Sequence, residues 1–330
     1  MRASVKEGCF VGLINMHCLV TGGAGFVGSH LVDLLLDAGH DVSIFDNFSS
    51  GRREFLQHHG EDVTVIEGDL LDLGAVNQAM QGIEIVYHLA ANPDIRLGTT
   101  ITDTDLKQGT VATYNVLEAM RLNGVKKIAF SSSSVVYGEA EQMPTPEDYG
   151  PLFPISLYGA SKLGSEALIT SWVGTFELQA WIFRFANIVG ARGTHGVIFD
   201  FIHKLRVDPN RLEVLGNGRQ EKSYMEVRDC AAAMIHLVSS TNETINCYNL
   251  GSDDTCSVSR IAEIVIEESG LPNVSIDYTG GDRGWAGDVP KAMLDPTRMN
   301  NAGYATKYNS EGAVRHTAQT LMEEIGIDNE

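Results

Sequence analysis

Cysteine is scarce in this sequence, and its pattern excludes several classes of protein. Five cysteines stand at positions 9, 18, 230, 247 and 256, an odd number without a CxxC pair. A chain of 330 residues buries a substantial core without disulfide bonds, so neither a disulfide scaffold nor a cysteine metal site is indicated. Reduced thiols are typical of the cytoplasm, and we expect a cytoplasmic protein.

Positive charge and long apolar runs are also in short supply. Lys and Arg number 24 against 43 Asp and Glu, which gives a net charge of −19. Nucleic acids and anionic membranes bind basic patches, so we expect neither as a partner. No apolar run approaches the roughly 20 residues that span a bilayer. The remaining composition, 43% hydrophobic and 20% charged, is that of an ordinary globular protein.

Short apolar runs alternate with helical patterns through the first half of the chain. Candidate strands are 18–21, 42–46, 63–67, 83–89, 127–131 and 180–184, with helices after the first strand, near 105–123 and over 157–172. This alternation predicts an α/β fold, a doubly wound parallel sheet of the Rossmann type. After Gly190 the loops become rich in glycine, which predicts a smaller C-terminal lobe.

A glycine-rich loop, Gly22–Gly28, follows the first predicted strand and opens a helix. Gly22 permits a tight turn, Gly25 lets the backbone approach a pyrophosphate, and Gly28 lets the helix pack closely. Free amides at the helix N-terminus would meet the phosphates. The same spacing occurs in plain turns, but the strand before it and the helix after it favour a dinucleotide site.

Two acidic residues follow the next strands. Asp46 ends the second strand, eighteen residues beyond Gly28 (46 − 28). A carboxylate there accepts hydrogen bonds from ribose hydroxyls and repels a 2′-phosphate, which favours NAD over NADP. A turn cap is the alternative for Asp46. Asp69, after the third strand, either reaches the adenine or caps its own loop.

These patterns divide the chain into three parts. We expect an N-terminal extension over 1–16, an NAD-binding Rossmann domain over 17–188, and mainly a substrate-binding lobe over 189–330. The run 245–250 is open to a return into the main sheet as a further strand. A translation start at Met16 instead of Met1 is the alternative for the extension.

Tyr158 and Lys162 lie four residues apart and share one face of a predicted helix. An ammonium near a phenol favours the phenolate, so we expect Lys162 to lower the pKa of Tyr158 and make it a proton acceptor. Such pairs also occur on solvated helix faces. The serine run 131–134 ends the fifth strand at the same edge of the sheet, where a hydroxyl can bridge a substrate oxygen and the tyrosine.

The motifs TGGAGFVGSH, FDNFSSG, GDLLD, YHLAA, SSSSVVYG, YGASK and FRFANIVG occur in the order found in the extended short-chain dehydrogenase/reductase family. The chain resembles the NAD-dependent nucleotide-sugar epimerases of that family, most of all the UDP-glucose 4-epimerases of archaea and bacteria, over residues 17–325. The resemblance implies bound NAD, a UDP-hexose substrate and a homodimer. It implies a cofactor site made of Gly22, Gly25, Phe26, Val27, Gly28, Asp46, Asn47, Ser50, Gly51, Asp69, Leu70, Leu89, Ala90, Ala91, Tyr158 and Lys162.

The resemblance also implies a mechanism and its catalytic residues, Ser133, Tyr158 and Lys162. Tyr158 would take the proton of the sugar O4 while C4 gives a hydride to NAD, and the transient 4-keto sugar would receive the hydride on its other face. Ser133 would bond the substrate oxygen, and Lys162 would hold the nicotinamide ribose. The substrate would lie against Ser133, Asn187, Val197, Ile198, Leu215, Lys222, Arg283 and Ala292, and no metal is implied.

Some positions depart from the family pattern. Ser134 and Val135 stand where dehydratase relatives carry Asp-Glu, which favours epimerisation over dehydration. Gly109 stands where the family has an asparagine, so one cofactor contact differs. Lys222 and Trp285 stand at two arginine positions; Lys222 lacks the bidentate guanidinium fork. Arg283, two residues before Trp285, either replaces the second arginine or is a surface residue.

One position bears on substrate size. The resemblance aligns Ala292 with a gate beside the sugar C2. A small gate admits N-acetyl groups, so Ala292 predicts that N-acetylated UDP-hexoses are accepted, unless Met293 fills the space.

Two alternative functions stay open. One is another nucleotide-sugar enzyme on the same scaffold, a dehydratase, a reductase or a different epimerase, and a net oxidoreductase would exchange its cofactor with solvent. The other is a non-catalytic NAD-sensing regulator, which would keep the glycine loop but has no need for Ser133, Tyr158 and Lys162 together.

Overall fold

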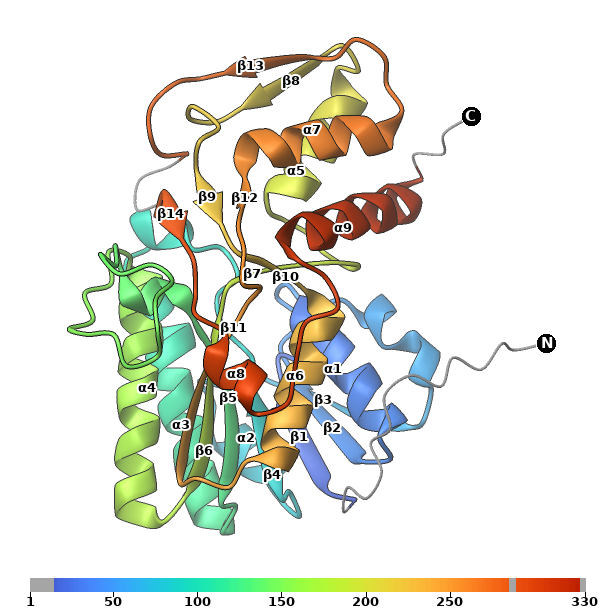
Figure 1. Cartoon of the computed structure of the whole chain (residues 1–330). Coiled ribbons are helices and arrows are strands. Elements are labelled where there is room, and N and C mark those ends of the chain that lie inside the picture. The colour runs from blue at the N-terminus through green and yellow to red at the C-terminus, as the bar shows by residue number, and fades with distance from the viewer. Residues whose placement is uncertain (1–14, 285–288, 327–330) are drawn as a thin grey trace.

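A seven-stranded parallel sheet forms the centre of the molecule (Figure 1). The computed structural model describes residues 15–284 and 289–326. The strands lie in the order β11-β6-β5-β4-β1-β2-β3. Their bounds are β1 His17–Thr21, β2 Asp41–Asp46, β3 Val63–Glu67, β4 Ile85–His88, β5 Lys127–Ser133, β6 Gln179–Phe185 and β11 Ile245–Leu250. The order reverses between β1 and β4, which defines a topological switch point.

The predicted α/β, doubly wound class is confirmed. All six predicted strands are present within two residues at either end, because apolar runs of this length in a sheet covered on both faces are distinctive. The run 245–250 hydrogen-bonds along β6 as an edge strand. Of the expected extension over 1–16, residues 1–14 lie outside the described residues.

Helices cover both faces of the sheet, as Figure 1 shows. On one face α1 (Phe26–Asp37) packs against α6 (Val227–Ser240), and on the other lie α2 (Leu73–Ala79), α3 (Ala112–Asn123) and α4 (Leu157–Phe176). Alternate residues of β1 point into the two cores: Val20 is buried with α1, and Leu19 with α2 and α3. None of the helices in the described part of the chain has the length and apolarity needed to cross a membrane.

A smaller lobe stands over one end of the sheet, at the top of Figure 1. Its core joins residues of three helices, α5 (Val197–Val207), α7 (Val258–Ser269) and α9 (Ser310–Ile325). Short strands complete it: β7 Asn187–Val189 with β10 Tyr224–Glu226, β8 Arg211–Val214 with β13 Ser275–Tyr278, and β9 Glu221–Lys222 between β12 Cys256–Ser257 and β14 Lys291–Ala292. Helix α8 (Thr297–Asn301) lies beside β11, so the last third of the chain contributes to both parts of the molecule.

Candidate active site

A cleft of about 290 Å³ opens at the C-terminal edge of the sheet, beside the switch point between β1 and β4. Open α/β sheets bind their ligands at this place. The cleft is lined by every residue predicted for the cofactor except Asp69: Gly22, Gly25, Phe26, Val27, Gly28, Asp46, Asn47, Ser50, Gly51, Leu70, Leu89, Ala90, Ala91, Tyr158 and Lys162.

The glycine loop forms a backbone cradle that side chains would fill. Gly22 has φ +71°, and a Cβ there would stand 2.8 Å from Ala90. A Cβ at Gly28 would stand 2.1 Å from the carbonyl oxygen of Gly22. Helix α1 begins after Gly25 with no side-chain cap, so its first amides face the cleft unpaired by a side chain. These features fit the diphosphate of a dinucleotide.

Asp46 is buried at the end of β2 and already has two backbone partners. The Ala24 amide donates to its Oδ2 at 3.0 Å, and the Phe48 amide donates to its Oδ1 at 2.8 Å. Burial raises the pKa of the Asp46 carboxyl, although these two hydrogen bonds oppose the rise. A carboxylate has about four acceptor sites, so Asp46 caps this turn and still has lone pairs for a ribose hydroxyl in the cleft.

Asp69 does not line the cleft. Its carboxylate is exposed and accepts the Leu71 amide at 2.9 Å, which is the loop cap that the sequence left as an alternative.

Helix α4 brings Tyr158 and Lys162 to the other end of the cleft. Ser156 caps the helix, with the Gly159 amide donating to its Oγ at 3.0 Å. Lys162 is 3% exposed, and its ammonium donates to the carbonyl of Ser131 at 2.6 Å and lies 5.7 Å from the centroid of the Tyr158 ring. The structure thus joins the phenol, the ammonium and the end of β5.

Ser133 is the last residue of β5. It follows Ser131 and Ser132, which line the cleft, and its own Oγ accepts the Val135 amide at 3.4 Å. The hydroxyl can still donate a hydrogen bond to another oxygen.

The pKa of Tyr158 differs from the sequence expectation. Burial raises it, and the carboxylate of Asp105 raises it further, so the lowering expected from Lys162 does not prevail. Burial also lowers the pKa of Lys162 to about 8, against the opposing influence of Glu166 and Asp105. The reason is desolvation, which disfavours the charged form of both groups, and no sequence spacing reports it.

A buried ion pair lies behind this end of the cleft. Arg184 on β6 donates from Nε to Glu166 Oε1 at 3.0 Å and from Nη2 to Oε2 at 2.7 Å. The Ser132 hydroxyl also donates to Oε1, at 2.5 Å. These contacts connect α4, β5 and β6 next to Lys162. Sequence reasoning missed them, although Glu166 lies four residues after Lys162 on the same helix face.

The segment before α3 is a π-helical turn, η4 (Leu106–Val111). Within it, a Cβ at Gly109 would stand 1.8 Å from Ser161 Oγ, so a side chain at the position aligned with the family asparagine would require Ser161 to move. The neighbouring Gln108 lines the cleft instead. Helical periodicity did not reveal this shift of one residue, because a π turn breaks the 3.6-residue repeat.

Ten further residues that were not among the predicted site residues line the cleft. Asn92 and Pro93 directly follow the predicted Leu89-Ala90-Ala91 segment, and that proximity was the signal available for them. The others are Phe45, Ser49, Gly68, Ser131, Ser132, Phe185, Thr194 and His195.

The predicted substrate residues lie outside the cleft lining, and the lobe brings some of them together. Lys222 on β9 is paired with Ala292 on β14, and the Asn187 amide group donates to the Ser223 carbonyl at 3.3 Å. Arg283 is bound to Glu139 at 2.5 Å.

Three further positions that the resemblance singled out differ from one another in where they lie. Ile198 is buried in the lobe core beside Val197 at the start of α5. Leu215 is 48% exposed. Trp285 lies outside the described residues.

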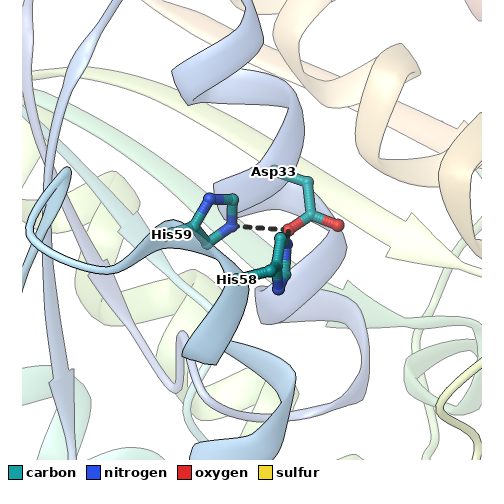
Figure 2. A group of neighbouring side chains, drawn as sticks. All are labelled: Asp33, His58 and His59. Atoms are coloured by element: carbon teal, nitrogen blue, oxygen red, sulfur yellow. Dashed lines mark hydrogen bonds and ion pairs between the residues drawn. The ribbon is translucent and has the colours of Figure 1, made fainter. Parts of the chain in front are cut away.

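A second group of titratable side chains consists of Asp33, His58 and His59, none of which is among the residues that line the cleft (Figure 2). Asp33 Oδ1 on α1 is 3.0 Å from His58 Nε2 and 2.8 Å from His59 Nε2, both on the short helix η2 (Gln57–His59). The Arg192 guanidinium donates to Asp33 Oδ2 at 2.8 Å, and Arg228 lies 3.9 Å away. Because two guanidinium groups balance this carboxylate, we interpret the group as a clamp between α1, η2 and the segment after β7.

Comparison with known proteins places these features in context. Residues 18–251 match the sequence model of the NAD dependent epimerase/dehydratase family. A Methanocaldococcus jannaschii protein named putative UDP-glucose 4-epimerase is 30% identical over 311 residues, 92% of this chain and 97% of the relative. A crystal structure of a UDP-galactose 4-epimerase has a TM-score of 0.85 at 40% identity, covering 94% of this chain and 100% of that one. The structure of the UDP-glucose 4-epimerase of Thermus thermophilus in complex with NAD has a TM-score of 0.83 at 28% identity. It covers 93% of this chain and 99% of that one.

Proposed function

This chain belongs to the NAD-dependent epimerase/dehydratase family, and from that premise we propose that it interconverts the C4 epimers of a UDP-hexose. The observation that carries the proposal is one cleft that joins a glycine cradle for a diphosphate to the buried Tyr158–Lys162 pair. A binding module would need the first feature alone.

We propose that the residues lining the cleft hold NAD. The amides at the start of α1 would receive the diphosphate, and Asp46 would accept the hydroxyls of the adenosine ribose. Lys162, Gln108 and Asn92 lie at the other end, where the nicotinamide and its ribose would lie. Bound NAD supplies reversible hydride acceptance at the sugar carbon, which no side chain provides.

The side chains would move the proton. Tyr158, as phenolate, would take the proton from the sugar O4 and return it after the keto sugar has turned over in the site. Ser133 would donate to the same oxygen, and the Lys162 ammonium would stabilise the phenolate. Because burial raises the pKa of Tyr158, a positive nicotinamide ring beside it would supply the remaining stabilisation.

The end of β5 favours epimerisation over dehydration. Ser134 and Val135 open the short helix η5 (Ser134–Tyr137) directly after Ser133. Elimination of water next to the keto group needs a second acid and base at this place, and neither residue titrates near neutral pH. A dehydratase would lack its acid–base pair here.

The lobe supports the choice of substrate. Lys222 and Ala292 are neighbours on β9 and β14, so a cation for a diphosphate lies beside the small residue aligned with the sugar gate. We propose that N-acetylated UDP-hexoses are accepted together with plain ones.

We further propose a cytoplasmic homodimer. Three large hydrophobic side chains are exposed here, Val111 at the end of η4 and Tyr114 and Leu122 on α3. The Tyr114 ring meets Trp172 of α4 edge-on, with the ring centroids 5.9 Å apart. An apolar stripe of this kind marks an interface. The four described cysteines are free thiols, which supports a reducing compartment.

The test is conversion of UDP-galactose to UDP-glucose by the purified protein without added nucleotide. We expect turnover with retained NAD, and Tyr158→Phe should lower it at least about 10³-fold because the proton acceptor is lost. NAD content, measured after denaturation, should equal that of the wild type.

Two results would contradict the proposal. Turnover that persists in Tyr158→Phe would remove the assigned base. Stoichiometric formation of NADH with each sugar converted would indicate a net oxidoreductase instead.

A further inference from the structure

Asp105 is a buried carboxylate that the proposed mechanism does not use. It precedes the π-helical turn η4 and is 2% exposed. The Asn92 side-chain amide donates to its Oδ1 at 3.0 Å, while Oδ2 is buried without a hydrogen-bond partner among the described residues. A buried carboxylate this poorly hydrogen-bonded needs a compensating charge.

Its position points to the catalytic end of the cleft. Asn92 lines the cleft together with Tyr158 and Lys162. A Cβ added at Gly98 would stand 2.8 Å from Asp105 Oδ2 and 3.4 Å from the Cβ of Leu157, the residue before Tyr158. The unpartnered oxygen is therefore next to the first turn of α4.

Two carboxylates act on Lys162, and only one of them is already paired with another cation. Glu166 and Asp105 both favour the charged form of Lys162. Glu166 is bound at both oxygens by Arg184, which neutralises it. His88 on β4 also faces Lys162, but burial lowers its pKa to about 3, so it is neutral at ordinary pH.

We propose that Asp105 is the counter-charge of Lys162, a positioning residue that balances the buried ammonium from beside the first turn of α4. The inference deepens the proposed function, because it assumes that Tyr158 is the base. Asn92 holds Asp105 in place and separates it from the ligand.

The proposal fixes the sign of a pH effect. Activity requires ionised Tyr158 and charged Lys162, so the pKa values of these two groups set the two limbs of its pH profile. A nearby negative charge raises both pKa values, as found for Asp105. Removing it lowers both, and the whole activity window moves to lower pH.

The experiment is a pH profile of kcat for the NAD-bound Asp105→Asn variant. We expect both limbs to move down by about one pH unit. Asp105→Glu, which keeps the charge, should restore the wild-type profile. Asp103→Asn is the matched control: it removes the same charge two residues away, at an exposed carboxylate paired with Lys107, and should not move the limbs.

A second measurement needs no substrate. The ultraviolet absorbance of phenolate is titrated in the wild type, and the Tyr158→Phe titration is subtracted to isolate Tyr158. The same subtraction, made in the Asp105→Asn background, should show ionisation at lower pH, whatever reaction the protein catalyses. Should Asp105→Asn fail to fold, Asp105→Ser serves the same comparison.

The outcomes separate the two ideas. A shifted phenol titration without epimerase activity supports Asp105 and contradicts the proposed function. Unchanged profiles and titrations in a folded, active Asp105→Asn variant overturn the role of Asp105. Loss of kcat without any shift in pH also overturns it, because that is the result of a structural role alone.

Discussion

At Gly28 the backbone of the protein leaves no room for a side chain. The position has an ordinary helical conformation, so its requirement for glycine comes from contact: the nearest carbonyl would be 2.1 Å from a Cβ. The contact holds the first turn of α1 against the turn after β1, which is the geometry that the cradle needs.

We predict that Gly28→Ala loses its NAD and is destabilised by about 1–3 kcal/mol, because the helix must move away from the turn. NAD content and urea unfolding measure both effects. Gly174→Ala on α4 is the control, since a Cβ there meets nothing within 4 Å; it should be neutral or stabilise by roughly 0.5–1 kcal/mol. Full NAD content in Gly28→Ala would contradict the cradle.

Ala292 is the residue for which the sugar specificity can be tested. We predict that Ala292→Tyr loses activity on N-acetylated UDP-hexoses by at least about tenfold in kcat/KM, while plain UDP-hexoses keep theirs, because the larger ring would fill the space beside C2. Competition between the two substrates measures this. Loss of both activities, or of neither, would remove Ala292 from the gate.

At the scale of the element, α1 is fastened by its C-terminal half as well as by its cradle. Asp33 is the point of attachment to η2 and to Arg192. Burial acts to raise the pKa of Asp33, but Arg192 and the His59 hydrogen bond outweigh it, and the pKa is lowered.

A lowered pKa makes the clamp a source of stability at neutral pH. The stabilisation is full above the unfolded pKa, near ~4, and is lost as the pH falls through the lower folded value. We predict that Asp33→Asn costs about 2 kcal/mol at pH 7 and less at about pH 3, which is below the unfolded pKa.

Urea unfolding at both pH values measures the difference. Asp37→Asn, an exposed carboxylate on the same helix, is the matched control and should have little effect at either pH. An equal cost for Asp33→Asn at both pH values would show that its charge is not the cause.

At the scale of the whole molecule, the stripe of Val111, Tyr114 and Leu122 is the surface that we propose for a second copy. We predict that Val111→Glu together with Tyr114→Glu converts the dimer to a monomer, because two charges per chain would be buried without partners. Sedimentation velocity measures the mass. Val207→Glu, at an apolar residue 88% exposed on α5, is the control and should leave the dimer intact. A wild-type monomer at micromolar concentration would contradict the interface.

Much of the molecule could be predicted from local patterns in the sequence. The Gly22–Gly28 cradle, Asp46 and the six strands could be predicted because their causes lie within a few residues: glycine where a Cβ would clash, and apolar runs where both sheet faces are covered. The Tyr158–Lys162 pair was visible for the same reason, as a helical spacing.

Other features depend on residues that are distant in sequence. Gln108 lines the cleft from a π-helical turn whose next residue, Gly109, lies against Ser161, fifty-two residues later (161 − 109). Asp69 was ambiguous because a carboxylate after a strand caps a loop as readily as it binds a ligand.

Sequence alone determined that the protein has a parallel sheet with a dinucleotide cradle and a tyrosine–lysine pair at one edge. Only the tertiary structure decided the electrostatics of that pair. It buried Lys162 beside Asp105 and a neutralised Glu166, and it raised the pKa of Tyr158 where spacing predicted a lower one. The physical reason is that desolvation and charge balance depend on everything that surrounds a group, whereas spacing along a helix reports only which neighbours share its face.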